Sequence, residues 1–223
     1  VTLNLHVVHP ENPQSEDDWA AVRQVQTVGN DVFLAPMLEG RMPEGLADLT
    51  SSITDWSCVQ DGDLDLIHQR LDVLGINYYT TTTVRRTHSG DIGLSGGHGE
   101  TGHSPWVGCS DVTFLPPSGS VTAMGWSVEP AGMTELLLDV SARYPQLPLM
   151  VTENGVAWDD EVGADHRVHD PRRISYLHDH LAAVLDAMEA GADVRGYFLW
   201  SLLDNFEWAW GYTKRFGITW VDY

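Results

Sequence analysis

The chain has 223 residues, and its 12 lysine and arginine residues against 32 aspartate and glutamate residues give a formal net charge of −20. Nucleic-acid binding needs a basic surface and an anionic membrane attracts basic segments, so this charge argues against both partners. With 43% hydrophobic and 20% charged residues, the chain can bury a core. The chain has an unusually large number of tryptophans, nine, and four of them lie in the segment from Trp200 to Trp220.

The cysteines and the apolar runs carry little information about function. Cys58 and Cys109 are far apart and lack metal-ligand spacing, so no disulfide framework is indicated. The longest apolar runs, such as residues 136–140, are too short to span a bilayer. We expect a cytoplasmic protein, although Val1 reads as the middle of a strand and a signal peptide stays open as an alternative.

Four apolar, β-branched or aromatic runs predict buried strands, because parallel strands covered on both faces show near-continuous apolar sequence. The runs span residues 1–8, 73–80, 147–152 and 194–202. Helical patterns lie between them, and strands that alternate with helices predict βαβ units around a parallel sheet. The segment 85–125 is rich in Gly, Ser, Thr and His and predicts a long loop.

Three helices are predicted from capping signals and helical spacing. Ser15 and Asp18 resemble a capping box, and Trp19, Val22 and Val25 follow at helical spacing. A second helix covers residues 133–144 and ends before a proline. The third begins with Asp170 as cap and Pro171 at its first position. Its predicted apolar stripe consists of Ile174, Leu177, Leu181, Val184, Leu185 and Met188.

The first candidate site residue is Glu153, which follows a predicted buried strand and precedes Gly155. In parallel α/β architectures, catalytic groups collect at the carboxyl ends of the strands. Taken alone, this segment is explained equally well by a helix-capping or loop glutamate.

A second segment, residues 196–212, combines Trp200 near a strand end with an acidic and aromatic loop. Sugar recognition needs this mixture, because indole rings cover the C–H face of a pyranose while carboxylates and amides bind its hydroxyls. The alternative interpretation, that these aromatic residues pack in a corner of the hydrophobic core, accounts for the tryptophans. It does not readily account for Asp204, Asn205 and Glu207, since unpaired carboxylates are rarely buried.

A third strand end closes with Asn77, Tyr78 and Tyr79. A tyrosine hydroxyl in this position is able to bond a catalytic carboxylate at a neighbouring strand end. Taken alone, the segment is better explained by a strand-end tyrosine whose hydroxyl faces water.

Together these segments resemble glycoside hydrolase family 1, the retaining β-glucosidases and their relatives, from the first residue of the chain to the last. The motifs that carry the resemblance are Pro43 in Gly-Arg-Met-Pro, Leu-Gly-Ile-Asn-Tyr-Tyr at 74–79, Met-Gly-Trp at 124–126, Thr-Glu-Asn-Gly at 152–155, Asp170 with Arg173, Tyr176 and Leu177, Asn-Phe-Glu-Trp at 205–208, and Phe216 with Gly217. Several motifs in the right order are far more specific than any single one.

The resemblance implies an α/β fold, a (β/α)8 TIM barrel of which the chain supplies about the last four βα units. Residues 1–223 would form the C-terminal half of one glycosidase domain. Glu153 is implied as the catalytic nucleophile and Tyr79 as its hydrogen-bond donor. The implied substrate-binding residues are Asn77 beside the reacting sugar, Trp200 under the glycone, Glu207 and Trp208 at its outer hydroxyls, Phe216 closing the pocket, and Trp126 on the aglycone side.

The implied activity is hydrolysis of terminal β-linked glucosides, or related β-glycosides, by a retaining double displacement. Two carboxylates suffice for this reaction, so no metal or organic cofactor is expected. The acid/base glutamate of the family lies in an Asn-Glu-Pro motif, which this chain lacks. The expected partners are therefore the sugar substrate and the N-terminal half of the barrel, and we expect the 223 residues alone to be inactive. Ser127 stands where the family commonly has an acidic residue, on the aglycone side.

Other interpretations carry less weight. The main alternative is a catalytically incomplete fragment or a non-catalytic carbohydrate-binding protein. A metal cluster of His98, His103 and Cys109 is less consistent with a Gly-rich loop than solvated histidines are. The glycines at 93, 96, 97 and 99 lack the Lys-Ser/Thr of a phosphate-binding loop. The acidic stretch 61–65 lacks the later glutamate of a calcium loop and predicts a helix start.

Overall fold

The computed structural model describes residues 1–88 and 106–223, which form two compact units. The first unit comprises Val1–Val7, Asp72–Thr81 and Pro117–Tyr223, and the second comprises Val8–Leu71 and Thr82–Pro116. The assignment of residues 1–223 to half of one barrel domain stays a prediction.

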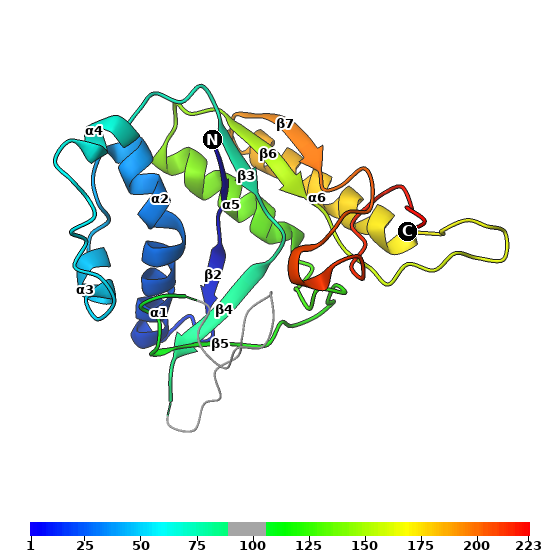
Figure 1. Ribbon diagram of the computed structural model, residues 1–223, viewed down its shortest axis with the longest axis horizontal. Helices are drawn as coiled ribbons and strands as arrows, with labels where there is room; N and C mark the ends of the chain where they lie inside the picture. Colours follow the sequence, from blue (N-terminus) through cyan, green and yellow to red (C-terminus); the bar gives the residue numbers. More distant parts are fainter. Residues whose placement is uncertain (89–105) are drawn as a thin grey trace. The chain divides into compact units, whose positions relative to one another are not determined.

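The first unit is built on a four-stranded parallel sheet (Figure 1). In spatial order its strands are β1 (Thr2–Asn4), β3 (Leu74–Asn77), β6 (Leu149–Asn154) and β7 (Val194–Leu199). Because all four strands run the same way, their carboxyl ends lie at one edge. The register places Asn77 opposite both Asn4 and Glu153, and Asn154 opposite Leu199. The parallel sheet predicted from the sequence is therefore present.

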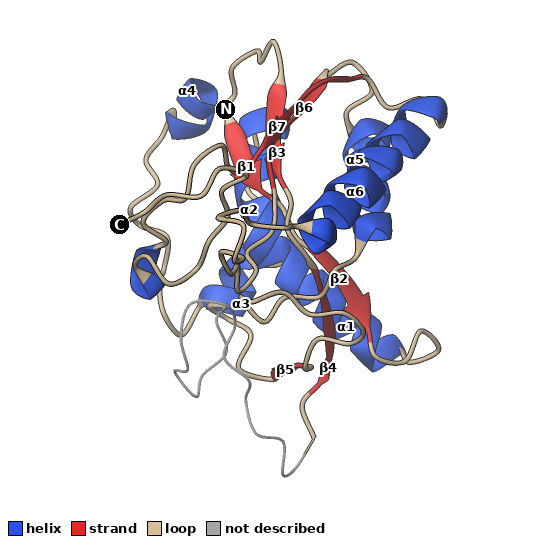
Figure 2. Ribbon diagram, turned by 90° about the vertical axis from the view of Figure 1, so that its right-hand side faces the viewer, coloured by secondary structure: helices blue, strands red, loops and turns tan. Residues whose placement is uncertain are grey.

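Two helices pack side by side on one side of this sheet: α5 (Pro130–Arg143) and α6 (Pro171–Glu189) (Figure 2). The start of α6 is the predicted one, because Pro171 occupies its first turn and the Asp170 carboxylate accepts a hydrogen bond from the backbone N–H of Arg173 at 3.3 Å. Thr134 joins the two helices by donating to the carbonyl of Ala183 at 2.9 Å.

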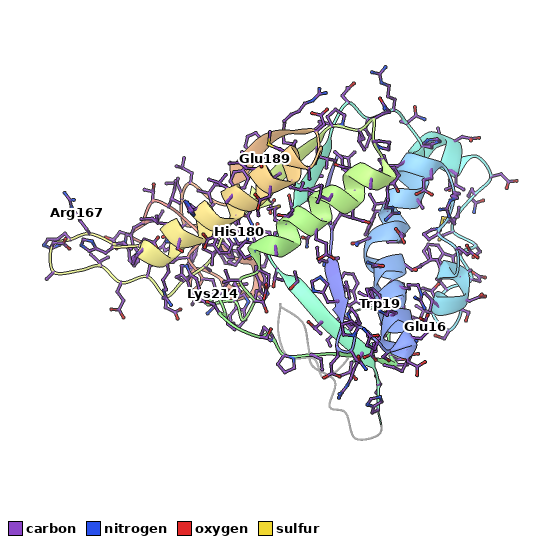
Figure 3. The ribbon with its side chains drawn as sticks, turned by 180° about the vertical axis from the view of Figure 1, so that it is seen from behind. Glu16, Trp19, Arg167, His180, Glu189 and Lys214 are labelled. Carbon is purple, nitrogen blue, oxygen red and sulfur yellow. The ribbon has the colours of Figure 1, made fainter. Side chains whose placement is uncertain are left out.

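The buried face of α6 differs from the predicted apolar stripe. Ile174, Leu181, Leu185 and Met188 are exposed, and the buried positions are Arg173, Tyr176, His180, Ala183, Val184 and Ala187. Val184 of the predicted stripe is buried and Leu177 is partly buried. The other four positions were wrong, because polar side chains with hydrogen-bond or ion-pair partners occupy part of the buried face. Arg173 forms ion pairs with Asp160 and Asp170. His180, marked on α6 in Figure 3, bonds the carbonyl of Tyr176 through Nδ1 at 2.8 Å, and burial lowers its pKa to about 4.

The apolar run over residues 1–8 forms two strands rather than the single strand predicted. β1 ends at Asn4, and β2 (Val7–Pro10) belongs to a second, three-stranded sheet with β4 (Thr81–Arg86) and β5 (Val112–Phe114) in the order β2-β4-β5. Val8 packs with Val84 and Phe114 in the core of the second unit. Leu5, Val7 and Val8 at the junction are all buried, so the apolar composition shows no break there.

The second unit also contains α1 (Glu16–Gln26), whose first turn is marked by Glu16 and Trp19 in Figure 3. Ser15 caps α1 by accepting from the N–H of Asp18 at 3.2 Å, as predicted. The Asp18 carboxylate instead accepts from the N–H groups of Asn12 and Arg86. Trp19 is partly exposed rather than in the core. The short helical segments are η1 (Thr27–Asp31), α2 (Val32–Leu34), η2 (Ala35–Glu39), α3 (Leu46–Thr50) and α4 (Asp63–Ile67). The last of these begins inside the acidic stretch 61–65, where a helix start was predicted.

Candidate active site

Glu153 and Tyr79 meet at the carboxyl edge of the parallel sheet. Glu153 lies near the end of β6, and Tyr79 lies two residues beyond β3. The Tyr79 hydroxyl donates a hydrogen bond of 2.7 Å to Oε2 of Glu153. Burial raises the pKa of Tyr79 above its usual value, and the hydrogen bond to Glu153 and the charges of Glu153 and Glu207 add to this effect. Tyr79 therefore stays protonated and acts as a donor to a charged carboxylate.

Aromatic rings surround the Tyr79 hydroxyl donor. The ring centroid of Trp126 lies 5.5 Å from that of Tyr79, and that of Phe216 lies 6.1 Å away in an edge-to-face arrangement. Phe216 is 1% exposed and packs in a cluster with Met124 and Trp200. A pyranose needs apolar ring faces beside hydrogen-bonding groups, and this cluster provides them next to Glu153.

Trp200 follows β7 and is attached by its backbone to the strand that carries Glu153. Its N–H donates to the carbonyl of Asn154 at 2.9 Å. Gly155 lies against the backbone of Trp200 so closely that a Cβ at position 155 would overlap the Trp200 carbonyl oxygen. Only glycine fits at this approach, whichever backbone angles it adopts.

Asn77, the last residue of β3, lies opposite Glu153 in the register. Its Oδ1 accepts a hydrogen bond from the Thr152 hydroxyl at 2.8 Å. The amide nitrogen of Asn77 is thereby directed away from Thr152, since the oxygen takes that donor.

The neighbours Glu207 and Trp208 differ in burial. Glu207 is 6% exposed, and its charge acts on Tyr79. Trp208 begins the short helix η3 (Trp208–Trp210) and is 76% exposed. The structure therefore brings Glu207 to the site around Tyr79 and leaves the Trp208 ring largely in solvent.

The carboxylate of Asp204 does not have the sugar-binding role that the sequence suggested. Its oxygens accept from the guanidinium of Arg215 at 2.5 Å and from the N–H groups of Gly217 and Val221 at 3.0 and 3.2 Å. The Arg215 guanidinium also lies over the ring of Trp220, 3.5 Å from its centroid. Asp204 is thus a buried structural carboxylate that fixes the loop between β7 and Phe216.

Replacing Asp204 with alanine is expected to destabilise the protein by about 3–5 kcal/mol, because it leaves the charge of Arg215 without its partner in a largely buried site. The free energy of unfolding, measured by urea denaturation, tests this expectation. Asp193→Ala is the matched control, since its ion pair with Arg195 is more than half exposed and such pairs contribute about 0–1 kcal/mol. Equal losses in the two variants would contradict the structural role of Asp204.

Asn154 entered the sequence analysis only as part of the Thr-Glu-Asn-Gly motif and was given no role of its own. It is completely buried, directly follows Glu153, and bonds side chains and backbone on three other elements. An amide at the end of an apolar strand is the signal that was available, since a buried amide has to be hydrogen-bonded.

A metal site is not supported in the part of the chain that the structure describes, where no group of three or more His, Cys, Asp or Glu residues is placed to hold an ion. His98 and His103, and the glycines at 93, 96, 97 and 99, lie outside the described residues. Cys109 is buried in the second unit, and burial raises its pKa to about 12. Within residues 1–88 and 106–223, no helix has the length and apolarity required to cross a membrane.

A carboxylate bonded by a tyrosine thus lies at the carboxyl edge of a parallel α/β sheet, among aromatic rings, and α/β barrels place their catalytic groups at this edge. The family model described as "Glycosyl hydrolase family 1" matches residues 1–223. The chain belongs to this family. The expected fold class, an α/β TIM barrel of which the chain supplies about four βα units, is confirmed.

Two curated relatives are similar in sequence. A bifunctional β-D-glucosidase/β-D-fucosidase from Bifidobacterium breve is 51% identical over 227 residues, covering 100% of this chain and 47% of the relative. The thermostable β-glucosidase B of Thermobispora bispora is 44% identical over 202 residues, covering 90% of this chain and 39% of the relative. The chain thus spans about half or less of the length of these relatives.

Two solved structures also match nearly all of this chain with less than half of their own length. A psychrophilic β-glucosidase from Micrococcus antarcticus superposes with a TM-score of 0.91 at 41% identity, over 99% of this chain and 48% of that one. The family 1 β-glucosidase from Thermotoga maritima in complex with isofagomine lactam has a TM-score of 0.84 at 34% identity, over 99% and 45%.

Proposed function

We propose that the chain is the nucleophile-bearing half of a retaining β-glucosidase that hydrolyses terminal β-linked glucosides and related β-glycosides. The observation that carries this proposal is the 2.7 Å hydrogen bond from Tyr79 to Glu153 at the strand ends, beside the cluster of Trp126, Trp200 and Phe216. The activities in the names of its relatives support the same substrate class, and the Bifidobacterium breve name adds β-fucosides to it.

Glu153 acts as the nucleophile in the proposed reaction. Its carboxylate attacks the anomeric carbon while the bond to the leaving oxygen breaks and a second carboxylic acid donates a proton to that oxygen. A glycosyl ester of Glu153 results. Water then gives a proton to the second carboxylate and attacks the anomeric carbon, which releases the sugar with its original configuration and frees Glu153.

The remaining residues hold the sugar in this proposal. Trp200 lies under the glycone, Trp126 lines the aglycone side, and Phe216 closes the pocket. Asn77 lies beside the reacting sugar, where its register partner is Glu153.

Glu207, assisted by Trp208, binds the outer hydroxyls of the glycone. The nearly complete burial of Glu207 and the action of its charge on Tyr79 support this placement. A 6-phosphosugar is a poor substrate in this arrangement, because the carboxylate repels a phosphate.

The second carboxylic acid is proposed to come from the N-terminal half of the barrel, in an Asn-Glu-Pro motif roughly 5–5.5 Å from Glu153. The two edges of the parallel sheet support this partner. Within the described residues, β1 pairs only with β3, and β7 pairs only with β6. An unpaired strand edge presents N–H and C=O groups that a further strand can bind. The cytoplasmic location stays a prediction.

Joining the two halves is the experiment that tests this proposal. The chain is fused behind the part of the Bifidobacterium breve relative that lies outside the matched 227 residues, which gives what we call the joined protein. We expect the joined protein to hydrolyse an aryl β-glucoside and the isolated chain to release no aryl alcohol, because one carboxylate cannot complete the double displacement.

Three outcomes would contradict the proposal. Robust hydrolysis by the isolated chain would show that no second half is needed. A folded joined protein that binds glucosides without hydrolysing them would favour the carbohydrate-binding alternative. A product of inverted anomeric configuration, detected by proton NMR, would exclude the covalent intermediate on Glu153.

A further inference from the structure

The strand that carries Glu153 departs from regular pairing where the catalytic edge begins. Between β3 and β6, Ile76 pairs with Val151, but the next residue, Asn77, pairs with Glu153, so β6 has one extra residue at this point. The pairing of β6 with β7 is also irregular, between Val151 and Asn154. Such bulges redirect side chains beside active sites and leave backbone groups without ladder partners.

The side chain of Asn154 bonds the groups around this irregularity. Its Nδ2 donates to the backbone carbonyl of Tyr78 at 2.8 Å and to the hydroxyl oxygen of Tyr176 at 3.1 Å. Its Oδ1 accepts from the hydroxyl of Tyr197 at 2.7 Å. One amide on β6 is thereby bonded to the end of β3, to β7 and to α6.

The backbone around Asn154 carries the groups of the proposed site. The Asn154 carbonyl accepts from the N–H of Trp200 at 2.9 Å, and the Glu153 carbonyl accepts from the N–H of Tyr78 at 3.0 Å. Tyr78 directly precedes Tyr79. The bonds made by Asn154 therefore fix the segments that hold Glu153, its donor Tyr79 and the ring of Trp200.

The hydrogen bonds of the Asn154 side chain are made out of contact with water. The residue is completely buried, and burial raises the pKa of Tyr176 and of Tyr197. Both tyrosines therefore stay protonated and keep the hydroxyl groups that bond Asn154. A buried amide that loses a partner keeps its desolvation cost, which is about 1–3 kcal/mol.

We propose that Asn154, held by Tyr176 and Tyr197, is a positioning residue that keeps the Glu153 carboxylate within hydrogen-bond distance of Tyr79. The expected effect of Asn154 on turnover rests on the proposed function, whereas its expected effect on the hydrogen bond does not. Asn154, Tyr176 and Tyr197 act by positioning Glu153 and do not contact the substrate. A misplacement of about 1 Å at a reacting group is enough to cost about a hundredfold in rate.

The first experiment measures the hydrogen bond itself, in the 223-residue chain and without substrate. A tyrosine hydroxyl proton donated to a carboxylate over 2.7 Å gives a downfield proton NMR signal. The signal is assigned to Tyr79 by its absence from the spectrum of Tyr79→Phe. In Asn154→Ala and in Tyr197→Phe, we expect this signal to move upfield or to broaden beyond detection. In Thr134→Val, which removes a hydrogen bond between α5 and α6 that involves none of the groups bonded to Asn154, we expect no change.

The second experiment measures turnover in the joined protein. We expect Tyr197→Phe to lower kcat about tenfold with KM within about twofold of the parent value, since positioning acts on the transition state. Thr134→Val is expected to keep the parent kcat and KM.

The outcomes separate this inference from the proposed function. An unchanged Tyr79 signal in Tyr197→Phe and Asn154→Ala would overturn the inference, whether or not the joined protein is active. A joined protein without activity would overturn the proposed function, while the NMR signal would still decide the role of Asn154. If Asn154→Ala does not fold, Tyr197→Phe decides, because it removes one oxygen atom from a residue on the neighbouring strand.

Discussion

Glu153→Gln is expected to lower kcat of the joined protein by more than about a thousandfold while leaving the binding of a glucoside nearly unchanged. Glutamine keeps the shape of the side chain and still accepts the hydrogen bond from the Tyr79 hydroxyl. It lacks the negative charge that attacks the anomeric carbon, so no glycosyl ester forms. Steady-state hydrolysis of an aryl β-glucoside gives kcat, and calorimetric titration with a non-hydrolysed glucoside gives the binding constant.

The control for this variant is Glu161→Gln, which makes the same chemical change at an exposed glutamate in the loop between β6 and α6. This control is expected to hydrolyse at the parent rate. In addition, Glu153→Ala with added azide is expected to form a glycosyl azide of inverted configuration, because the small anion attacks from the side that Glu153 vacates. Near-normal hydrolysis by Glu153→Gln would remove Glu153 from the mechanism.

The parallel sheet and the position of its catalytic edge were predictable from the sequence. Buried parallel strands have continuous apolar sequence, and residues that end such strands gather at one edge. Glu153, Tyr79 and Trp200 were identified as candidates for this reason, and the structure places them beside one another.

The run over residues 1–8 shows where composition fails. Leu5, Val7 and Val8 are all buried, yet Leu5 follows β1 of the parallel sheet, whereas Val7 and Val8 lie in β2 of the three-stranded sheet. Hydrophobicity records that a residue is buried and does not record which neighbour covers it. A strand that changes sheets without a Gly or Pro therefore has no sequence signal.

Buried polar groups account for the other differences. Periodicity placed Ile174 and Leu181 on the inner face of α6, whereas the inner face contains Arg173 and His180. Asp204 was interpreted as a sugar ligand, although Arg215 and two backbone N–H groups already bond it. In each case hydrogen bonds or ion pairs make the burial favourable, and hydrophobic periodicity takes no account of such pairs.

Gly155→Ala is the second substitution with a large expected effect, although it adds only one methyl group. The added Cβ would overlap the carbonyl oxygen of Trp200, which is backbone and cannot turn aside as a side chain can. To relieve the overlap, the end of β6 has to move away from β7, which breaks the 2.9 Å bond from the Trp200 N–H to the Asn154 carbonyl. We expect a loss of about 3 kcal/mol or more in the free energy of unfolding.

The same movement separates Glu153 from the ring that is proposed to lie under the glycone, so kcat/KM of the joined protein is expected to fall by about a hundredfold or more. Gly196→Ala in β7 is the matched control, because the Cβ there would meet the flexible end of Met150, at 3.2 Å from its Cε. That side chain can rotate, so the control is expected to keep most of its stability and its activity. Parent-like unfolding and hydrolysis in Gly155→Ala would show that the contact between Gly155 and Trp200 does not set the geometry of the site.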